Sequence, residues 1–335
     1  MTILVNPWRG IGLDIPELED IPAPSTDATR VRALLTRCPV HERTPLTHAP
    51  ALHPGLWLKD ERNRMGLGSF KALGAAYVIA CDAEEGQAEG RTYVTASAGN
   101  HGLSVAAGAA AFGAKAQVYI ARNVPEAFAE RLREIGAEVI RAGNDYEQSM
   151  QAAGSAAAAG AGLLLSDSSW PGYTARPHRL MEGYLALMAE AIEQLPEAPD
   201  GVFLQAGVGG FAGAMAALVR QTWGDAPKIA VVEPAFAPAL QSSIAEGKPV
   251  MARGPASSMG RLDCKEPSLI ALKGLARDAD YFITLTEDEA AAATRAMTDA
   301  GFATTPSGAA GYAGIVASRL PPEAKLLAFL TEGPE

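Results

Sequence analysis

Short, mostly apolar runs recur along the chain, and alanine-rich stretches with helical periodicity separate most of them. Runs that are apolar on both faces are typical of parallel strands that helices cover on two sides. The alternation predicts an α/β protein with mainly parallel sheets, and the 335 residues suit one large or two closely joined lobes. The runs that we expect to form strands are residues 91–97, 116–121, 137–142, 162–167, 201–207, 228–234, 280–286 and 326–333.

A lysine, Lys71, lies among small residues where an apolar helix begins, in the stretch GLGSFKALG (66–74). Most lysines are exposed, so a surface lysine is the simplest interpretation. A permanent cation is unfavourable at this end of a helix, however, because the helix dipole places partial positive charge there. Gly66 and Gly68 allow a sharp turn before the helix, and Ser69 can cap it. We therefore expect a buried amine that loses its proton more easily than a free lysine and can form a Schiff base.

A second polar stretch, VTASAGNHG (94–102), follows one of the predicted strands and leads into a helix. Backbone N–H groups and polar side chains meet there, at the end of the strand where open α/β sheets bind ligands. The sequence indicates an anion site for a carboxylate or a phosphate, formed by Ser97, Gly99, Asn100 and His101. The alternative is a capped turn with a surface histidine.

A glycine-rich loop, GVGGFAG (207–213), follows another predicted strand and opens the next helix. Gly207, Gly209 and Ala212 fit the loose spacing of a dinucleotide fingerprint, and Glu233 ends the next strand where a ribose-binding acid would be. A glycine loop before a helix serves any phosphate, though, and a dehydrogenase would leave Lys71 without a function. We favour a phosphate monoester site.

A fourth stretch, TTPSGAAGY (304–312), places Ser307 before an apolar helix. Ser307 is either a cavity residue or an ordinary N-cap.

Charge and cysteine usage narrow the class of protein. The net charge of -10 and the isoelectric point near 5.1 argue against nucleic acid and anionic membranes as partners. The chain opens without a signal-like segment, and no run approaches about 18 strongly apolar residues, so we expect a cytoplasmic protein. Cys38, Cys81 and Cys264 are too widely spaced to indicate a disulfide framework or a metal site.

Together, these motifs resemble those of the fold type II pyridoxal-phosphate enzymes, which include threonine dehydratase, cysteine synthase and diaminopropionate ammonia-lyase. The resemblance runs from TPL (44–46) and LKDE (58–61) through GSFKALGA and SAGNHG to SGAAG and the closing TEG. Diaminopropionate ammonia-lyase is the nearest match, because of GLGSFKALG, SDSSWPGYT (166–174), GRLDCKEPS (260–268) and LTEG.

The resemblance implies roles for the residues of these motifs. Lys71, beside Phe70, would hold pyridoxal 5'-phosphate as a Schiff base and then remove the α-proton of a small amino-acid substrate. Asn100 would contact the phenolic oxygen of the cofactor, and Ser307 its pyridine nitrogen. The substrate carboxylate would be gripped by Ser97, Ala98, Gly99 and His101. The cofactor phosphate would be held by Gly207, Val208, Gly209 and Gly210.

The resemblance also implies a domain organisation. A smaller, mobile α/β domain would comprise residues 88–178, and a larger one residues 1–87 and 179–335, with the cofactor in the cleft between them. Each lobe would contain a mainly parallel sheet covered by helices. The protein would be a homodimer.

A serine hydroxyl does not enforce a protonated pyridine ring, so the resemblance favours α,β-elimination over transamination. The aminoacrylate formed would hydrolyse to a 2-oxo acid and ammonia. Diaminopropionate ammonia-lyases typically carry aspartate where this chain has Ala98, and SAGNH is typical of serine and threonine dehydratases. Asp167 could bind a β-amino group, protonate a leaving group, or merely cap the next turn. A β-replacement synthase is the alternative, and an NAD-dependent oxidoreductase or a ligand-binding sensor is a remote one.

Overall fold

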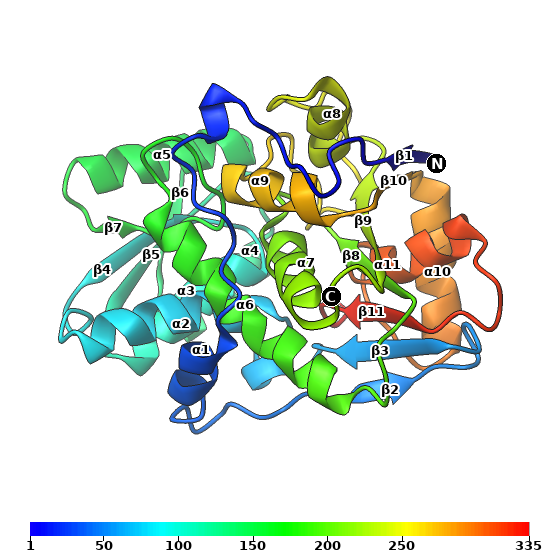
Figure 1. Ribbon diagram of the computed structural model, residues 1–335. Coiled ribbons are helices and arrows are strands. Elements are labelled where there is room, and N and C mark those ends of the chain that lie inside the picture. The colour runs from blue at the N-terminus through cyan, green and yellow to red at the C-terminus, as the bar shows by residue number, and fades with distance from the viewer. Residues whose placement is uncertain (335) are drawn as a thin grey trace.

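A computed structural model describes residues 1–334 and contains two sheets within them (Figure 1). In the larger sheet, neighbouring strands follow the order β1-β10-β9-β8-β11-β3-β2. Its strands are β1 (Thr2–Val5), β2 (Leu46–His48), β3 (Leu56–Asp60), β8 (Gly201–Gln205), β9 (Lys228–Pro234), β10 (Tyr281–Leu285) and β11 (Leu326–Leu330). The smaller sheet has the order β6-β5-β4-β7 and comprises β4 (Thr92–Ala96), β5 (Lys115–Ile120), β6 (Glu138–Arg141) and β7 (Leu163–Leu164).

The predicted α/β class is confirmed, because every pairing is parallel except those of β1 with β10 and of β2 with β3. Each of the eight apolar runs contains a strand, whereas β1, β2 and β3 were not predicted. In β3, Leu56 and Leu58 are fully buried, Trp57 between them is partly buried, and the strand ends in Lys59 and Asp60. Lys59 is also fully buried, and its ion pair with Glu190 compensates its charge. A pattern of hydrophobic residues cannot reveal such a buried lysine.

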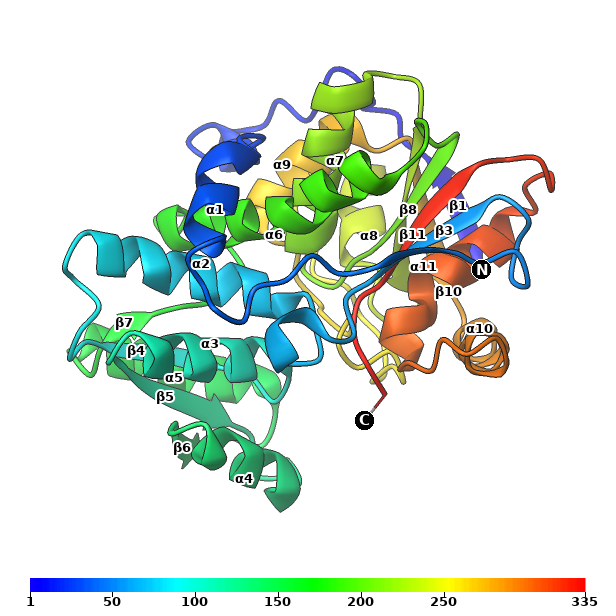
Figure 2. The ribbon, with the colours of Figure 1, turned by 90° about the horizontal axis from the view of Figure 1, so that it is seen from below.

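Helices cover the sheets on both faces (Figures 1 and 2). Alanine-rich sequence gives them small side chains, so they approach one another and the strands closely. The α-helices are α1 (Ala28–Leu35), α2 (Lys71–Glu84), α3 (Asn100–Ala111), α4 (Glu126–Glu134), α5 (Tyr146–Ala158), α6 (Ala175–Gln194), α7 (Gly210–Trp223), α8 (Ala239–Glu246), α9 (Leu269–Asp278), α10 (Glu287–Asp299) and α11 (Pro306–Ser318). Two 3₁₀ turns are η1 (Pro16–Leu18) and η2 (Arg64–Gly66).

The two sheets lie apart in Figure 2, and α2 and α6, which contact each other, run between them. One continuous hydrophobic core includes residues from both sheets and from α2, α6 and α7. A second core fills the space between the larger sheet and α10 and α11. All strands of the smaller sheet fall between residues 92 and 164. The domain boundaries at 88 and 178, and the mobility of the smaller domain, stay predictions.

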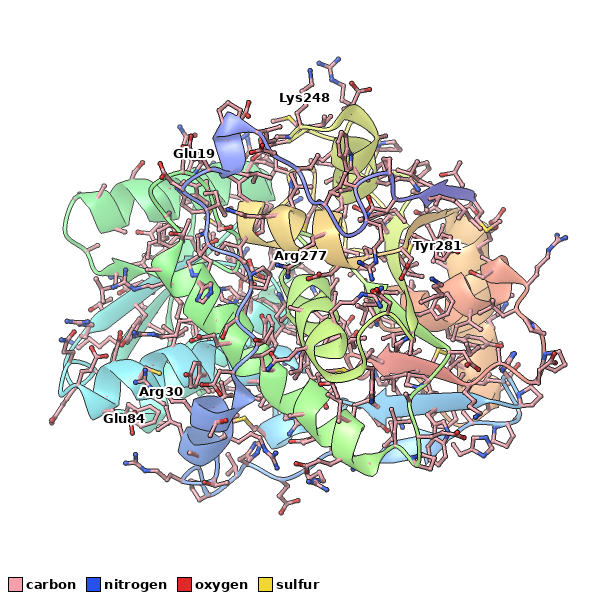
Figure 3. The ribbon with its side chains drawn as sticks, viewed as in Figure 1. Glu19, Arg30, Glu84, Lys248, Arg277 and Tyr281 are labelled. Carbon is pink, nitrogen blue, oxygen red and sulfur yellow. The ribbon has the colours of Figure 1, made fainter. Side chains whose placement is uncertain are left out.

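Charged side chains of both signs are spread over the molecule, among them those of Glu19, Arg30, Glu84, Lys248 and Arg277 (Figure 3). Arg30 on α1 pairs with Glu84 on α2 at 3.7 Å. No helix within residues 1–334 is both long and apolar enough to cross a membrane.

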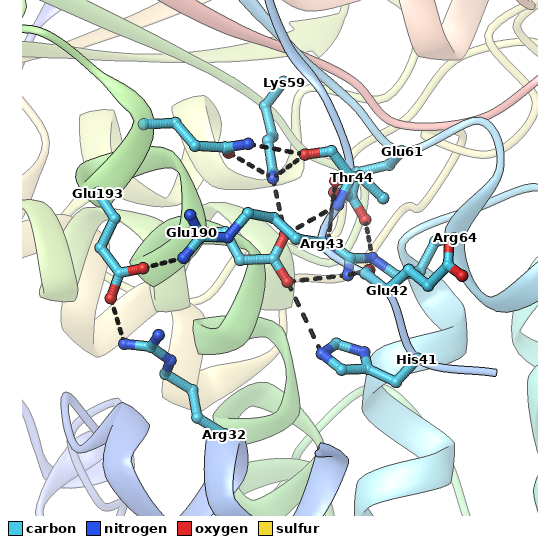
Figure 4. Close-up of polar contacts among 11 residues, drawn as sticks. Arg32, His41, Glu42, Arg43, Thr44, Lys59, Glu61, Arg64, Glu190 and Glu193 are labelled. Atoms are coloured by element: carbon cyan, nitrogen blue, oxygen red, sulfur yellow. Dashed lines mark hydrogen bonds and ion pairs between the residues drawn. The ribbon is translucent and has the colours of Figure 1, made fainter. Parts of the chain in front are cut away.

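A buried ionic network includes Arg64, which lies in η2 just before the turn that leads to Lys71 (Figure 4). Arg64 is fully buried and binds Glu61 on its own segment and Glu190 on α6. The chain then turns through Gly66 and Gly68, whose φ angles of 70° and 79° suit glycine. The network thus fixes the starting point of this turn against α6.

Candidate active site

A cavity of about 320 Å³ lies at the carboxyl ends of β4, β7, β8 and β11. It is lined by residues that follow these strands and by the first turns of α2, α3, α7 and α11. This is the edge at which parallel sheets bind ligands, because the strand ends and helix N-termini converge there. The lining includes every residue for which a catalytic role or a contact with pyridoxal phosphate or the substrate was expected: Phe70, Lys71, Ser97, Ala98, Gly99, Asn100, His101, Asp167, Gly207, Val208, Gly209, Gly210 and Ser307. Their individual roles stay predictions.

Lys71 is the first residue of α2, and the predicted burial of this helix is confirmed. Its backbone N–H donates to Ser69 Oγ at 3.3 Å, so Ser69 contributes to the start of the helix. The side chain is 22% exposed and lines the cavity, and its Nζ lies 5.4 Å from the ring centroid of Phe70 and 5.7 Å from that of Tyr184. The interpretation of Lys71 as an ordinary surface lysine is therefore wrong.

The charge state expected for Lys71 is corrected by the structure. Its Nζ lies 2.6 Å from Asp167 Oδ2. Burial disfavours the ammonium, but the charge and hydrogen bond of Asp167 outweigh burial and raise the pKa of Lys71. Burial likewise opposes ionisation of Asp167, yet the nearby Lys71 holds the pKa of that carboxyl below its usual range. The two groups form an ion pair, which the sequence did not reveal because they are 96 residues apart.

The SAGNH loop crosses from β4 to α3, which begins at Asn100. Ser97 Oγ accepts a hydrogen bond from the backbone N–H of Gly99 at 3.2 Å and so tightens the loop. Asn100 Nδ2 donates to Glu332 Oε2 at 2.5 Å. His101 is 5% exposed, and its Nε2 lies 2.9 Å from the carbonyl oxygen of Leu165. The surface-histidine alternative is therefore wrong; burial also lowers the pKa of His101.

The glycine loop lies between β8 and α7 at a point where side chains would not fit. A Cβ on Gly207 would lie 2.9 Å from Cys264 Sγ, and one on Gly209 would lie 2.9 Å from Leu240 Cδ1. Gly209 also has a φ of 97°. The close packing brings bare backbone to the cavity at the N-terminus of α7, where N–H groups and the helix dipole favour an anion.

Glu233, the residue that a dinucleotide site would use, has another function in the structure. Its two carboxylate oxygens accept hydrogen bonds from the backbone N–H groups of Leu240 and Gln241 at 2.7 and 2.8 Å. Burial raises the pKa of Glu233 to about 8. Glu233 therefore organises the start of α8 and is not directed at a ribose.

Ser307 lies in the first turn of α11, where it lines the cavity. The N-cap is Thr305, whose side chain accepts a hydrogen bond from the backbone N–H of Gly308 at 3.1 Å. The interpretation of Ser307 as a simple N-cap is therefore wrong. Its Oγ accepts a hydrogen bond from the backbone N–H of Arg261 at 3.1 Å.

Further lining residues had no role assigned from the sequence. Arg261 Nη1 donates to the carbonyl oxygen of Ala98 at 3.1 Å, and Glu332 also accepts a hydrogen bond from Thr305 Oγ1. Both belong to motifs that carry the family resemblance, GRLDCKEPS and TEG. These motifs lie in irregular loops, where no periodic pattern indicates which residue has a function. Tyr146, at the start of α5, lines the cavity from the smaller sheet's side.

Comparison with known proteins agrees with this geometry. Residues 38–332 match a family described as pyridoxal-phosphate dependent enzymes. The chain belongs to this family. A diaminopropionate ammonia-lyase from Salmonella typhimurium is 34% identical over 320 residues, which cover 84% of this chain and 79% of that relative. The Escherichia coli K12 enzyme of the same name is 31% identical over 261 residues, covering 72% of this chain and 66% of that relative.

The solved structures of pyridoxal-phosphate dependent enzymes include close matches in fold. The Escherichia coli diaminopropionate ammonia-lyase, in complex with an aminoacrylate–PLP azomethine reaction intermediate, has a TM-score of 0.88 and 26% identity. The match covers 99% of this chain and 93% of that chain.

Among the sequence relatives, an L-threonine ammonia-lyase from Thermotoga maritima is 26% identical, over 88% of this chain and 71% of that relative.

The residues around the cavity fit pyridoxal phosphate, the cofactor of this family. Packing at Gly207 and Gly209 is too close for a Cβ, so backbone without side chains lies at the N-terminus of a 14-residue helix, which suits a phosphate. Lys71 supplies an amine to the same cavity, and Asn100 and Ser307 supply polar side chains of the kinds predicted to contact the ring.

Proposed function

We propose that this enzyme catalyses α,β-elimination on a small amino acid, giving a 2-oxo acid and ammonia. The observation that carries the proposal is the ion pair of Lys71 with Asp167 in a cavity that the glycine loop after β8 also lines. The named relatives, diaminopropionate ammonia-lyases and threonine ammonia-lyases, support this class of reaction.

The cofactor, when bound, supplies the electron sink that makes the α-proton of an amino acid acidic, a chemistry that protein side chains lack. In the proposal, Lys71 would hold the cofactor covalently, and its amine, once free, would accept the α-proton at Nζ. Backbone N–H groups of residues 207–210 would hold the phosphate. Ser97 and Gly99 of the SAGNH loop would orient the substrate carboxylate. The hydroxyl of Ser307 would contact the pyridine nitrogen.

Asp167 favours a β-ammonium leaving group over a β-hydroxyl. Its carboxylate binds an ammonium, that of Lys71, at 2.6 Å, and this cation outweighs burial and holds the pKa of Asp167 below the usual range. A substrate β-ammonium can bind the same oxygen when Lys71 is engaged with the cofactor. We therefore propose 2,3-diaminopropionate as the preferred substrate.

Ala98 supports a second candidate, a serine or threonine dehydratase. This position lies at the cavity and carries only a methyl group, so it provides no second base beside the α-carbon. With Lys71 as the base on one face, the proposal includes a preference for the L enantiomer. β-Replacement through the same aminoacrylate would require a second substrate that acts as a nucleophile.

The proposal also includes a smaller mobile domain, residues 88–178, that closes over the cofactor. It further includes a homodimer and a cytoplasmic location. Cys38, Cys81 and Cys264 are free thiols, which suits a reducing compartment. Sedimentation analysis of the purified protein tests the dimer.

A substrate screen tests the proposal directly. Protein purified with pyridoxal phosphate is supplied with the L and D forms of 2,3-diaminopropionate, serine and threonine, and release of 2-oxo acid and ammonia is followed. We expect turnover to be fastest with L-2,3-diaminopropionate. Equal rates for both enantiomers would reveal a second base. Absence of 2-oxo acid from every substrate would contradict elimination.

A further inference from the structure

Asp167 lies on a segment that the smaller sheet alone does not hold. β7 has two residues and forms one edge of that sheet, next to β4. The last backbone contact with β4 is the hydrogen bond from Leu165 N–H to the carbonyl of Val94, at 2.8 Å. Asp167 follows two residues later. A side chain in such a position is placed only as accurately as its backbone, so the contacts of residues 164–169 decide where the carboxylate lies.

On the open edge of β7, where no further strand pairs with it, the hydroxyl of Tyr173 forms hydrogen bonds with the backbone. Its hydroxyl donates to the carbonyl of Leu164 at 2.8 Å and accepts from the N–H of Ser166 at 3.1 Å. Burial raises the pKa of Tyr173 to about 12, so the hydroxyl stays protonated and can make both bonds. The two bonded residues lie on the outer edge of β7 and immediately before Asp167. One hydroxyl thus forms hydrogen bonds with the backbone on the edge that does not pair with β4.

The ring of Tyr173 is itself fixed. It stacks on Trp170 with ring centroids 4.4 Å apart and planes inclined by 19°. The two backbones pair as well: Tyr173 N–H donates to the carbonyl of Trp170 at 2.9 Å, and Trp170 N–H donates back at 3.3 Å. The hairpin formed by residues 170–173 therefore returns the phenol to the start of the Asp167 segment.

The other end of the segment is bound to the larger lobe. Ser169 Oγ lies 2.7 Å from Ser268 Oγ, and both serines are buried. Ser268 N–H in turn donates to the carbonyl of Val208 at 2.9 Å, in the glycine loop. Asp167 is thus held between Tyr173 on one side and a serine pair that connects to the loop proposed to bind phosphate.

We propose that Tyr173 is a positioning residue for Asp167, and through it determines selectivity for a β-amino over a β-hydroxyl substrate. The two hydrogen bonds of its hydroxyl fix the backbone before Asp167, and so fix the position at which the carboxylate binds an ammonium in the cavity. The selectivity part of this inference rests on the proposed function, in which Asp167 binds the β-ammonium. The contact itself does not depend on the reaction.

The test compares Tyr173→Phe with a matched variant, Tyr93→Phe. Both changes remove a single hydroxyl at the smaller sheet, and the hydroxyl of Tyr93 donates to Asp82 on α2 at 2.8 Å and not to residues 164–169. For Tyr173→Phe we expect kcat/KM for 2,3-diaminopropionate to fall about 10-fold to 100-fold, as displaced reacting groups do. Activity on serine should fall less, so the ratio of the two values decreases. Tyr93→Phe should leave this ratio unchanged.

Two further readouts separate positioning from general damage. Amide hydrogen exchange of Ser166 should accelerate in Tyr173→Phe and not in Tyr93→Phe. In the Tyr173→Phe, Asp167→Asn double variant, the losses of kcat/KM should not add, because the first change acts through the second residue. An unchanged exchange rate, an unchanged substrate ratio, or additive losses would overturn the inference. A wild-type protein that releases no 2-oxo acid would contradict the proposed function instead, and exchange alone would then judge the contact.

Discussion

The molecule contains two pairs of a lysine with a carboxylate that look alike in distance and differ in surroundings. Lys59 Nζ lies 2.7 Å from Glu190 Oε2, and Lys71 Nζ lies 2.6 Å from Asp167 Oδ2. Lys59 is fully buried and donates two further hydrogen bonds, to the carbonyl of Thr44 and to Gln194 Oε1, both at 2.8 Å. Lys71 faces a cavity, and Asp167 is its hydrogen-bond acceptor among the described residues.

The difference separates a structural ion pair from one that is available for chemistry. All three ammonium hydrogens of Lys59 can be satisfied, and Glu190 is shared with Arg64 (Figure 4). Such a group cannot exchange partners without leaving a buried charge unpaired. Lys71 retains donor capacity and space, so a substrate or cofactor can replace its partner. Burial alone therefore does not distinguish the two lysines; the adjacent cavity and the unused donor capacity of Lys71 do.

The largest expected effect is that of Lys71→Ala. Turnover should become undetectable, because loss of a positioned base alone costs about 10² to 10⁴ in rate and the covalent attachment is lost as well. Cofactor should still bind non-covalently, and the free energy of unfolding should change little. Borohydride reduction followed by peptide mapping identifies the attached lysine in the wild type. Cofactor fixed on Lys59 or any other lysine would refute the assignment.

Glu190→Gln should break the other pair and affect stability instead of chemistry. We expect a loss of about 3 to 5 kcal/mol in the free energy of unfolding, because Lys59 and Arg64 keep buried charge without its full complement. Urea denaturation measures this loss. The control is Glu193→Gln, three residues further along α6, where the partly exposed carboxylate pairs with Arg32 and Arg43. That change should cost at most about 1 kcal/mol; equal losses would show that the network is not special.

Asp167→Asn should preserve folding and change the substrate preference. The amide keeps the shape but loses the charge that binds an ammonium, so kcat/KM for 2,3-diaminopropionate should fall by about 10². The loss for serine should be smaller. Steady-state kinetics with both substrates give the ratio. A uniform loss with both substrates would assign Asp167 a general structural role.

Gly209→Val should lower occupancy of the cofactor with little change in either ion pair. The φ of 97° is unfavourable for a branched residue, and the added carbons would press on Leu240 and Ala271. We expect the Kd for pyridoxal phosphate to rise about tenfold, or about 1.4 kcal/mol, as measured by absorbance titration. Tight binding of NAD in competition with pyridoxal phosphate would contradict the phosphate-monoester interpretation.

Glu233 sharpens the comparison because it is a buried carboxyl that accepts hydrogen bonds from backbone N–H groups and, within residues 1–334, has no cationic partner like those of Glu190 and Asp167. Burial raises its pKa to about 8, above the usual 4.5. The folded state therefore holds a proton that the unfolded state releases between these pH values. The free energy of unfolding should decrease as pH rises from about 4.5 to 8, by up to about 1.4 kcal/mol per unit from this group. Denaturation across this range should show a smaller slope for Glu233→Gln; an identical slope would exclude Glu233 as the source.

Much of the fold was predictable from the sequence because buried parallel strands are uniformly apolar. β8 and β11 are fully buried over their whole length, and such runs are distinctive. β3 was missed because Lys59 interrupts the pattern, although Glu190, 131 residues away, makes its burial possible. The loops of the site were found because glycines and polar residues after a strand indicate an anion site. Glu332 and Arg261 were not assigned roles, because nothing local distinguishes them from other loop residues.

The sequence by itself determined the alternation of strands and helices, the four motifs that line the site and the family to which the chain belongs. These features depend on local periodicity and on motifs of a few residues. Only the tertiary structure decided the charge state of Lys71, which local reasoning predicted with the wrong sign. The helix N-terminus and burial both favour a neutral amine, but a carboxylate from a distant segment lies 2.6 Å away and reverses the balance. Electrostatic energies depend on distances in space, and the fold sets those distances.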